Sequence, residues 1–265
     1  MTEFEIARRG TVLEFALDRS EKRNALTLPI VDGLRQATEE LAQSSDLQVL
    51  LVHARGDYFS AGIDLHSALL PDPAIRSPSE FRRWYRSGKG CLQPLGDLWE
   101  AVEKPIVVAH QGPCIGGALE LSLCADFRLA SERATYALPE IAMGGLPGSG
   151  GLSRLARLVG PQWTRWLALA GQTVDASRAL AMGLVHEVYP ADQFETRVRE
   201  FCDTLAQLPR EAFAAGKIAV ALCADLGRAE ARNVERLAVS GLVMGDEYRA
   251  AVENYLAKFD TKTRP

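Results

Sequence analysis

Hydrophobic and polar positions in the first half of the chain follow the periods of strands and helices. Residues 11–18 (TVLEFALD) alternate with period two, which predicts a half-buried strand that follows a first strand near residues 3–8. Residues 28–43 carry apolar side chains at helical spacing, and Thr27 is a suitable N-cap for that helix. Two short runs rich in β-branched residues each lead into a Gly-containing turn: 48–54 and 105–109. Repeated strand, turn and helix units predict an α/β fold with a largely parallel sheet.

The pattern changes near Asp192, where helical periodicity takes over. Pro209, Gly227 and Gly245 mark the joints between four predicted helices. These helices are 194–208, 210–223, 228–243 and 246–259. We therefore expect two regions: an α/β core with the functional site over 1–190, and a helical region over 191–265.

The segment Ser67 to Glu103 is long, polar and aromatic, and it contains Pro71, Pro73 and Pro78. We interpret it as a partly helical insertion. Lids and pocket walls are often built from such segments.

Composition and charge exclude several classes of partner. The chain is 47% hydrophobic and 24% charged, with a formal net charge of −4, and its Lys and Arg residues are scattered instead of forming blocks. This distribution predicts no binding to nucleic acid or to an anionic membrane surface. No uninterrupted apolar run is long enough for a membrane span, and the N-terminus has charges where an export signal needs apolar residues, so we expect a cytoplasmic protein.

Cysteine and histidine usage predicts neither a disulfide framework nor a metal site. The five cysteines are odd in number and no two form a C-x-x-C pair, which favours reduced thiols. The four histidines show no metal-ligand spacing. The sequence also contains no G-x-S-x-G nucleophile motif and no glycine-rich nucleotide loop.

Two isolated glutamates are the strongest candidates for chemistry. Glu120 is the only charge between Lys104 and Asp126, and Glu140 is the only charge between Arg133 and Arg154. Burial of a carboxylate is costly unless it is paired, hydrogen-bonded or protonated, so such residues often mark a site. The alternative for Glu120 is a position on the one solvated stripe of a short helix. Two carboxylates can divide a proton transfer, one as base and one as acid.

Two glycine turns can supply backbone N–H donors. Residues 58–65 (YFSAGIDL) and 112–118 (GPCIGGA) each lead from a strand through glycines, the second into the helix that carries Glu120. Exposed N–H groups at such a turn suit a developing oxyanion. Tight-turn glycines are the alternative interpretation for either turn alone, and Asp64 can equally be an N-cap.

These motifs together closely resemble the crotonase (enoyl-CoA hydratase/isomerase) superfamily, most of all enoyl-CoA hydratase. The resemblance runs in order over residues 3 to 260. It rests on 18–19 (DR), 23–26 (RNAL), 59–65 (FSAGIDL), 112–121 (GPCIGGALEL), 139–140 (PE), 146–151 (LPGSGG) and 179–185 (ALAMGLV).

The resemblance implies a crotonase-type spiral of β-β-α turns, a C-terminal helical trimerisation region and an acyl-CoA thioester substrate. The N–H groups of Ile63 and Gly117 would form the oxyanion hole. Glu120 would activate water at C3 and Glu140 would protonate C2. The resemblance further implies substrate or CoA contacts at Lys22, Arg23, Ala25, Ala61, Gly62, Asp64, Leu65, Gly116, Pro139 and Gly148. A dienoyl-CoA isomerase-like subgroup of the superfamily has an acid at the position of Gly148, whereas hydratases have glycine there, as this sequence does.

The expected function is syn addition of water to a 2-enoyl-CoA. No separate cofactor is expected, because coenzyme A is part of the substrate. A homotrimer or a dimer of trimers is expected, since apolar side chains such as Leu237, Leu242 and Val243 need a partner surface. The alternatives are an enoyl- or dienoyl-CoA isomerase of the same superfamily and a catalytically inactive binding module on this fold.

Overall fold

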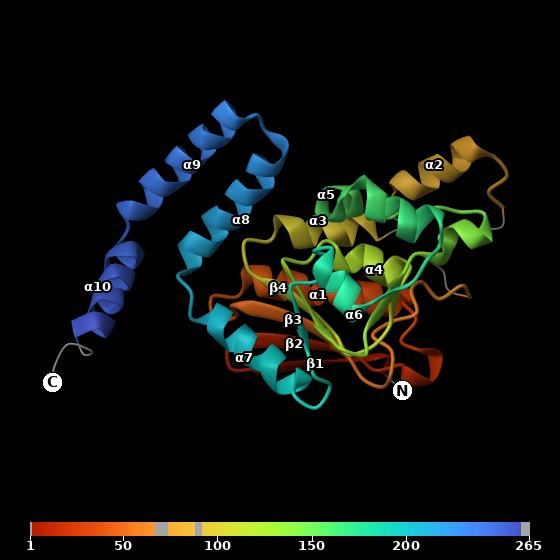
Figure 1. Cartoon of the computed structure of the whole chain (residues 1–265), viewed down its shortest axis with the longest axis horizontal. Helices are drawn as coiled ribbons and strands as arrows, with labels where there is room; N and C mark the ends of the chain where they lie inside the picture. The colour runs from red at the N-terminus through yellow and green to blue at the C-terminus, as the bar shows by residue number, and fades with distance from the viewer. Residues whose placement is uncertain (1, 67–73, 88–91, 261–265) are drawn as a thin grey trace. The chain divides into compact units, whose positions relative to one another are not determined.

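The chain divides into two compact units, Met1–Asp203 and Thr204–Pro265. The computed structural model describes residues 2–66, 74–87 and 92–260 (Figure 1). Two stretches of the predicted insertion, 67–73 and 88–91, lie outside the described residues, and the second of them contains Cys91. The described parts of that insertion include two helices, α2 (Pro78–Arg86) and α3 (Gln93–Ala101).

A six-stranded sheet forms the framework of the first unit. Its order is β1-β2-β3-β4-β6-β9, in which β1 and β2 are antiparallel and every other neighbouring pair is parallel. The largely parallel sheet predicted from the sequence is thus confirmed. The strands are β1 (Phe4–Arg9), β2 (Val12–Leu17), β3 (Val49–Ala54), β4 (Ile106–His110), β6 (Phe127–Ser131) and β9 (Glu187–Tyr189).

The prediction that residues 11–18 form a half-buried strand is wrong in one respect, because all six residues of β2 are buried. Glu14, on the polar side of the alternation, lies under α7 (Phe194–Ala206) and pairs with Arg9 at 2.7 Å. Arg199 of α7 lies 3.9 Å from the same carboxylate. A helix on the second face of the sheet therefore removes water from positions that the sequence pattern marks as exposed.

Short strands that alternate along the chain with those of the large sheet form a second, three-stranded sheet. Its order is β5-β7-β8, with β5 (Cys114–Ile115) parallel to β7 (Thr135–Ala137) and β7 antiparallel to β8 (Val174–Asp175). The chain passes from β4 in the large sheet to β5 in the small one and into α4 (Gly117–Ser122), then from β6 to β7 and into η2 (Pro139–Met143). These successive β-β-α turns confirm the predicted spiral.

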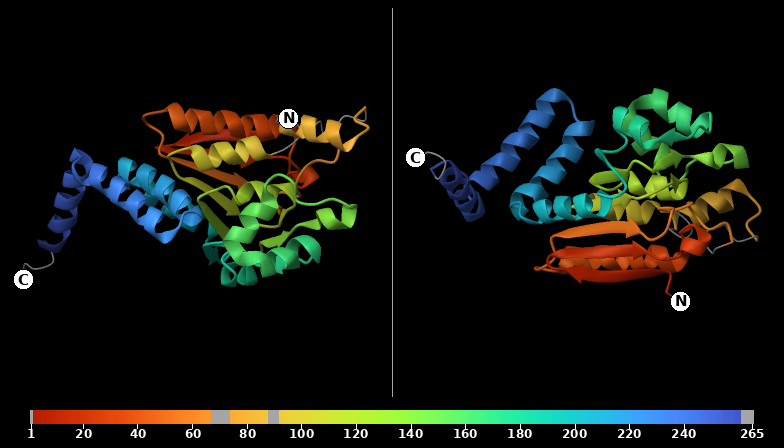
Figure 2. Two further views of the ribbon diagram at one scale, coloured as in Figure 1. Left: turned by 90° about the horizontal axis from the view of Figure 1, so that it is seen from above. Right: turned by 60° about the horizontal axis from the view of Figure 1, so that its bottom comes forward.

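Helices cover both faces of the large sheet. The helix α1 (Leu28–Gln43) has the predicted bounds and begins at Thr27, whose hydroxyl accepts from the Ile30 N–H at 3.4 Å. It packs beside α3 (Figure 2), and the Trp99 indole of α3 donates to the Thr38 hydroxyl at 2.9 Å. On the other face, Phe201 of α7 packs edge-on against Phe127 of β6. The remaining elements of this unit are η1 (Ser20–Lys22), α5 (Gly151–Thr164), η3 (Arg165–Leu169) and α6 (Ala176–Ala181).

A buried polar group fixes the short helix α4. His110, at the end of β4, is within 2.9 Å of the Ser122 hydroxyl through Nε2 and within 3.1 Å of the Tyr136 hydroxyl through Nδ1. Complete burial lowers the pKa of His110 to about 3, so its ring is neutral at physiological pH. The ring therefore ties α4 to β4 and β7 without placing a charge in the core.

The second unit consists of α8 (Arg210–Asp225), α9 (Arg228–Val243), α10 (Asp246–Asp260) and the last residues of α7. Neither α8 nor α9 contains a buried residue. Among the residues that the structure describes, no helix is long and apolar enough to cross a membrane.

Candidate active site

A pocket of about 640 Å³ in the first unit collects most of the residues singled out by the sequence. Its walls come from the 61–65 loop, from α2, from the start of α4, from η2 and from the loop before α5. The lining residues are Ala61, Gly62, Ile63, Leu65, Phe81, Trp84, Tyr85, Gly116, Gly117, Glu120, Pro139, Glu140, Met143, Gly145, Leu146, Gly148 and Ser149.

The two glycine turns are joined by main-chain hydrogen bonds. The Ile115 N–H donates to the Ser60 carbonyl at 3.0 Å. Gly62 has a φ of 91°, and a Cβ there would lie 2.7 Å from the Ile115 carbonyl oxygen, so only glycine fits this approach. A Cβ on Gly62 would also lie 3.3 Å from the Gly117 nitrogen, so the two turns are in close contact.

Ile63 and Gly117 carry the predicted oxyanion donors. Gly117 is the first residue of α4, where an N–H has no acceptor within its own helix. Across residues 2–66, 74–87 and 92–260, neither the Ile63 nor the Gly117 N–H has a hydrogen-bond acceptor. Two unused donors on residues that line one pocket suit an oxygen that gains negative charge.

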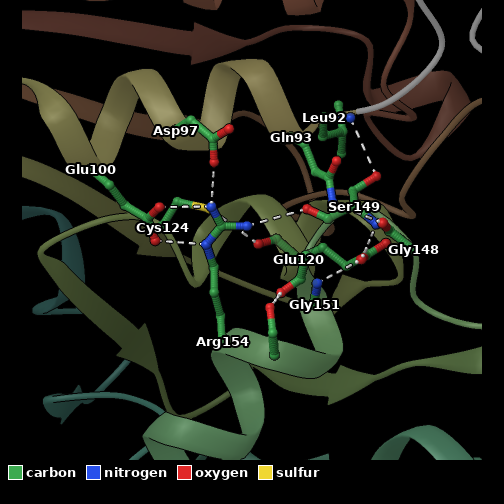
Figure 3. Close-up of polar contacts among 12 residues, drawn as sticks. Leu92, Gln93, Asp97, Glu100, Glu120, Cys124, Gly148, Ser149, Gly151 and Arg154 are labelled. Carbon is green, nitrogen blue, oxygen red and sulfur yellow. Dashed lines mark hydrogen bonds and ion pairs between the residues drawn. The ribbon is translucent and has the colours of Figure 1, made fainter. Parts of the chain in front are cut away.

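Glu120 lines the pocket and is only 3% exposed. One carboxylate oxygen, Oε2, accepts from the Ser149 N–H at 2.7 Å and from the Gly151 N–H at 3.0 Å (Figure 3). Burial raises the pKa of Glu120 to about 7, repulsion from Glu140 adds to the rise, and the two N–H groups and Arg154 oppose it. The solvated-stripe interpretation of Glu120 is therefore wrong.

Glu140 reaches the same pocket from η2. It follows β7, which pairs with β5, and the Gly116 N–H donates to the Ala137 carbonyl at 2.9 Å. A Cβ on Gly116 would lie 2.8 Å from Glu140 Oε1, so this glycine leaves room for the carboxyl. Within the described part of the chain Oε2 is buried without a hydrogen-bond partner. Burial raises the pKa of Glu140 as well.

The two carboxyls line one pocket, and burial raises the pKa of both. The charge of Glu140 adds to the rise in the pKa of Glu120. Glu120 accepts two N–H bonds that favour its ionised form, whereas Glu140 Oε2 accepts none. A pKa of about 7 lets Glu120 take up or release a proton near neutral pH, and the two N–H bonds favour its ionised form.

Four residues predicted to contact the ligand do not line the pocket itself. Lys22 and Arg23 are exposed on the neighbouring surface, and the Arg23 carbonyl accepts from the Ala61 N–H at 2.9 Å. Ala25 is half-buried in the same segment. Asp64 accepts from the His66 N–H at 2.9 Å and from Arg19 at 2.7 Å, and these two bonds lower its pKa.

The aromatic segment that the sequence analysis compares with lids and pocket walls does supply one wall of the pocket, although its individual residues were not predicted. Phe81, Trp84 and Tyr85 of α2 line the pocket, and the Phe81 and Tyr85 rings stack with centroids 5.7 Å apart. Their spacing of three and four residues along a helix is a visible signal of one shared face. Only the fold assigns that face to the pocket. Leu146 and Ser149 of the 146–151 motif also line the pocket, although the sequence did not predict them as site residues.

The family model for enoyl-CoA hydratase/isomerase matches residues 7–263. The chain therefore belongs to the enoyl-CoA hydratase/isomerase family, within the crotonase superfamily that its sequence resembles.

Individual relatives agree with this assignment. The chain is 32% identical over 193 residues to a 2,3-dehydroadipyl-CoA hydratase of Escherichia coli strain K12, covering 72% of this chain and 71% of that protein. It is 30% identical over 259 residues to an enoyl-CoA isomerase/hydratase of Mycosarcoma maydis, covering 93% and 90%. The crystal structure of an enoyl-CoA hydratase from Thermoplasma volcanium superposes with a TM-score of 0.84 at 29% identity, covering 96% and 98% of the two chains.

Proposed function

We propose that the protein is an enoyl-CoA hydratase that adds water across the C2=C3 double bond of a 2-enoyl-CoA thioester. The observation that carries the proposal is the pairing of Glu120 and Glu140 in one pocket with the unused N–H groups of Ile63 and Gly117. The names of the two relatives above support a CoA thioester as substrate.

The proposed reaction uses each of these groups once. Ionised Glu120 removes a proton from water as the water oxygen bonds to C3. The C2=C3 electrons move toward the thioester, and the N–H groups of Ile63 and Gly117 stabilise the negative carbonyl oxygen, an effect worth about 3–4 kcal/mol for one such donor in other enzymes. Protonated Glu140 then gives its proton to C2. Transfer of the proton on Glu120 back to Glu140, directly or through solvent, restores the starting state. No separate cofactor is proposed.

For the CoA moiety we propose contacts at Lys22 and Arg23, beside the Ala61–Gly62 turn. Main-chain bonds from Ala61 to Arg23 and from Leu26 to the Gly62 carbonyl, at 2.9 and 2.7 Å, tie this segment to the loop that carries Ile63. Cations held next to the oxyanion donors suit the phosphates of a bound CoA.

Isomerisation of the double bond is the second candidate function. The same two carboxyls can move a proton between C2 and C4 without adding water. Gly148 favours the hydratase over a dienoyl-CoA isomerase, because glycine supplies no acid at the position where that subgroup has one.

A turnover screen across short, medium, branched and aromatic 2-enoyl-CoA thioesters tests the proposal. Hydration predicts loss of the conjugated thioester absorbance and a product heavier by one water. A product of unchanged mass identifies an isomerase. No turnover on any acyl-CoA, together with retained binding, identifies an inactive binding module.

We also propose that the chain forms a homotrimer or a dimer of trimers. In the second unit Leu237 is 75% and Met244 is 74% exposed, and α8 and α9 bury no residue. Such apolar surface is typical of a face that another chain covers. Light scattering should return three or six times the chain mass of 28.9 kDa, and a monomer would contradict this proposal.

A further inference from the structure

Arg154, on the first turn of α5, has no part in the reaction proposed above, yet it is built into the support of Glu120. Its side chain is only 15% exposed. The guanidinium donates to Glu100 through Nε and Nη2 at 2.6 and 2.7 Å, and to Asp97 through Nη2 at 2.8 Å (Figure 3). Both acids lie on α3, so the arginine links α3 to the start of α5.

The same guanidinium contacts the loop that holds the Glu120 carboxylate. Nη1 donates to the Ser149 carbonyl at 3.3 Å, while the Ser149 and Gly151 N–H groups both donate to Glu120. Gly150 lies between them with a φ of 93°, and a Cβ there would stand 2.0 Å from Nη1. The guanidinium therefore occupies space that exists only because residue 150 is glycine.

The α3 helix supports this loop at two further points. The Leu92 N–H donates to the Ser149 hydroxyl at 3.3 Å, and the Gln93 amide donates to the Gly148 carbonyl at 3.4 Å. A planar guanidinium has five donors in a fixed fork, so it can bind a bidentate carboxylate and a carbonyl together, which a lysine ammonium does with less directional control.

Charged and titratable groups from several elements surround this cluster. Glu140 of η2 and Arg154 of α5 act on Glu120, and Asp97 and Glu100 of α3 pair with Arg154. The Cys124 thiol, just after α4, interacts with Arg154, with the two α3 acids and with Glu120. Both α3 acids are paired with the Arg154 guanidinium, and negative charges so close to a cation oppose its attraction for another carboxylate. The cluster of Arg154, Asp97 and Glu100 therefore contacts the Ser149–Gly151 loop and also sets the balance of charge near Glu120.

We propose that Arg154 is a positioning residue: clamped by Asp97 and Glu100, it holds the Ser149 peptide so that the Ser149 and Gly151 N–H groups aim at Glu120. This role rests on the proposed function, since it serves the carboxylate that activates water. Loss of the clamp leaves Glu120 in place but frees its two donors to move and removes a positive charge that favours the ionised carboxylate.

The test compares Arg154→Gln, Arg154→Lys and Glu100→Gln with Arg157→Gln, an exposed arginine on the same helix. Arg154→Gln should lower kcat by about 10- to 100-fold, with little change in KM, and should move the ascending limb of the pH profile of kcat/KM to higher pH. Glu100→Gln should move that limb to lower pH, because Arg154 is then less neutralised. Arg154→Lys keeps the positive charge, so the ascending limb should stay close to its wild-type pH while kcat is only partly retained. Arg157→Gln should change neither the position of the limb nor kcat.

Two results would overturn the proposal. One is a kcat loss in Arg154→Gln and Glu100→Gln with no opposed movement of the pH limb, which is the behaviour of a merely structural clamp. The other is a full further loss when Arg154→Gln is added to Glu120→Gln, since a residue that acts through Glu120 has little left to remove.

A measurement without substrate separates this proposal from the hydratase assignment. The unfolding free energy is measured against pH for wild type and Glu120→Gln, and again for Arg154→Gln and the double variant. Within each pair, the difference reports the ionisation of Glu120, with Arg154 present in the first pair and absent in the second. The proposal expects that ionisation to shift to higher pH in Arg154→Gln, and an unchanged dependence contradicts it. If the wild type hydrates no enoyl-CoA, the proposed function fails while this readout still decides whether Arg154 controls Glu120.

Discussion

Replacement of Glu120 by Gln should lower kcat by about 100-fold or more, and it should raise the unfolding free energy relative to wild type as the pH rises. The pKa of Glu120 is raised from 4.5 to about 7, first by burial and then by Glu140. Because the native state binds this proton more tightly than the unfolded chain does, the carboxyl contributes most stability below pH 4.5, and that contribution is lost as the pH rises to 7.

The size of the effect follows from the same pKa values. A rise from 4.5 to about 7 at about 1.4 kcal/mol for each tenfold change in the ionisation constant corresponds to about 3 kcal/mol. Glutamine does not titrate. The unfolding free energy of Glu120→Gln, taken relative to wild type, should therefore increase by roughly 2–3 kcal/mol between about pH 5 and about pH 8. The substitution should lower kcat by about 100-fold or more.

Urea denaturation at a fixed protein concentration measures this difference, since association between chains would otherwise add a concentration-dependent term. Changes that do not depend on pH, such as a poorer hydrogen bond from the amide, cancel between the two pH values. Glu39→Gln, at an exposed position of α1, is the control and should follow the wild type at both. A difference between Glu120→Gln and wild type that stays constant from about pH 5 to about pH 8 would refute the view that Glu120 ionises at a cost to folding.

Three further results are expected. Hydration in deuterated water should place one deuterium at C2 of the product, and Glu140→Gln should reduce kcat by about 100-fold or more; full activity in that variant would exclude Glu140 as the proton donor. Gly116→Ala should destabilise the fold by about 1–3 kcal/mol and impair turnover, because φ is 56° and the added Cβ meets Glu140; Gly216→Ala, in open space on α8, should be neutral or stabilising. Lys22→Ala with Arg23→Ala should weaken acetyl-CoA binding in calorimetry, more at low salt than at high salt.

The sequence by itself determined the elements whose signals are local. The bounds of α1 and its cap at Thr27 follow from apolar spacing and from a hydroxyl that accepts an N–H three residues on. Proline and glycine likewise marked the joints of the C-terminal helices close to their observed ends. Glu120 and Glu140 were recognisable because a lone charge in an apolar, glycine-rich stretch must be paired, hydrogen-bonded or protonated if it is buried.

Only the tertiary structure decided which distant groups meet. The burial of Glu14 depends on α7, which covers a face of β2 that the alternating pattern assigns to water. The position of Arg154 between Ser149 and the acids of α3 depends on contacts among segments whose spacing in the sequence carries no signal. Local patterns report the preferences of one element at a time, whereas burial and charge balance at a site are sums over all the elements packed around it.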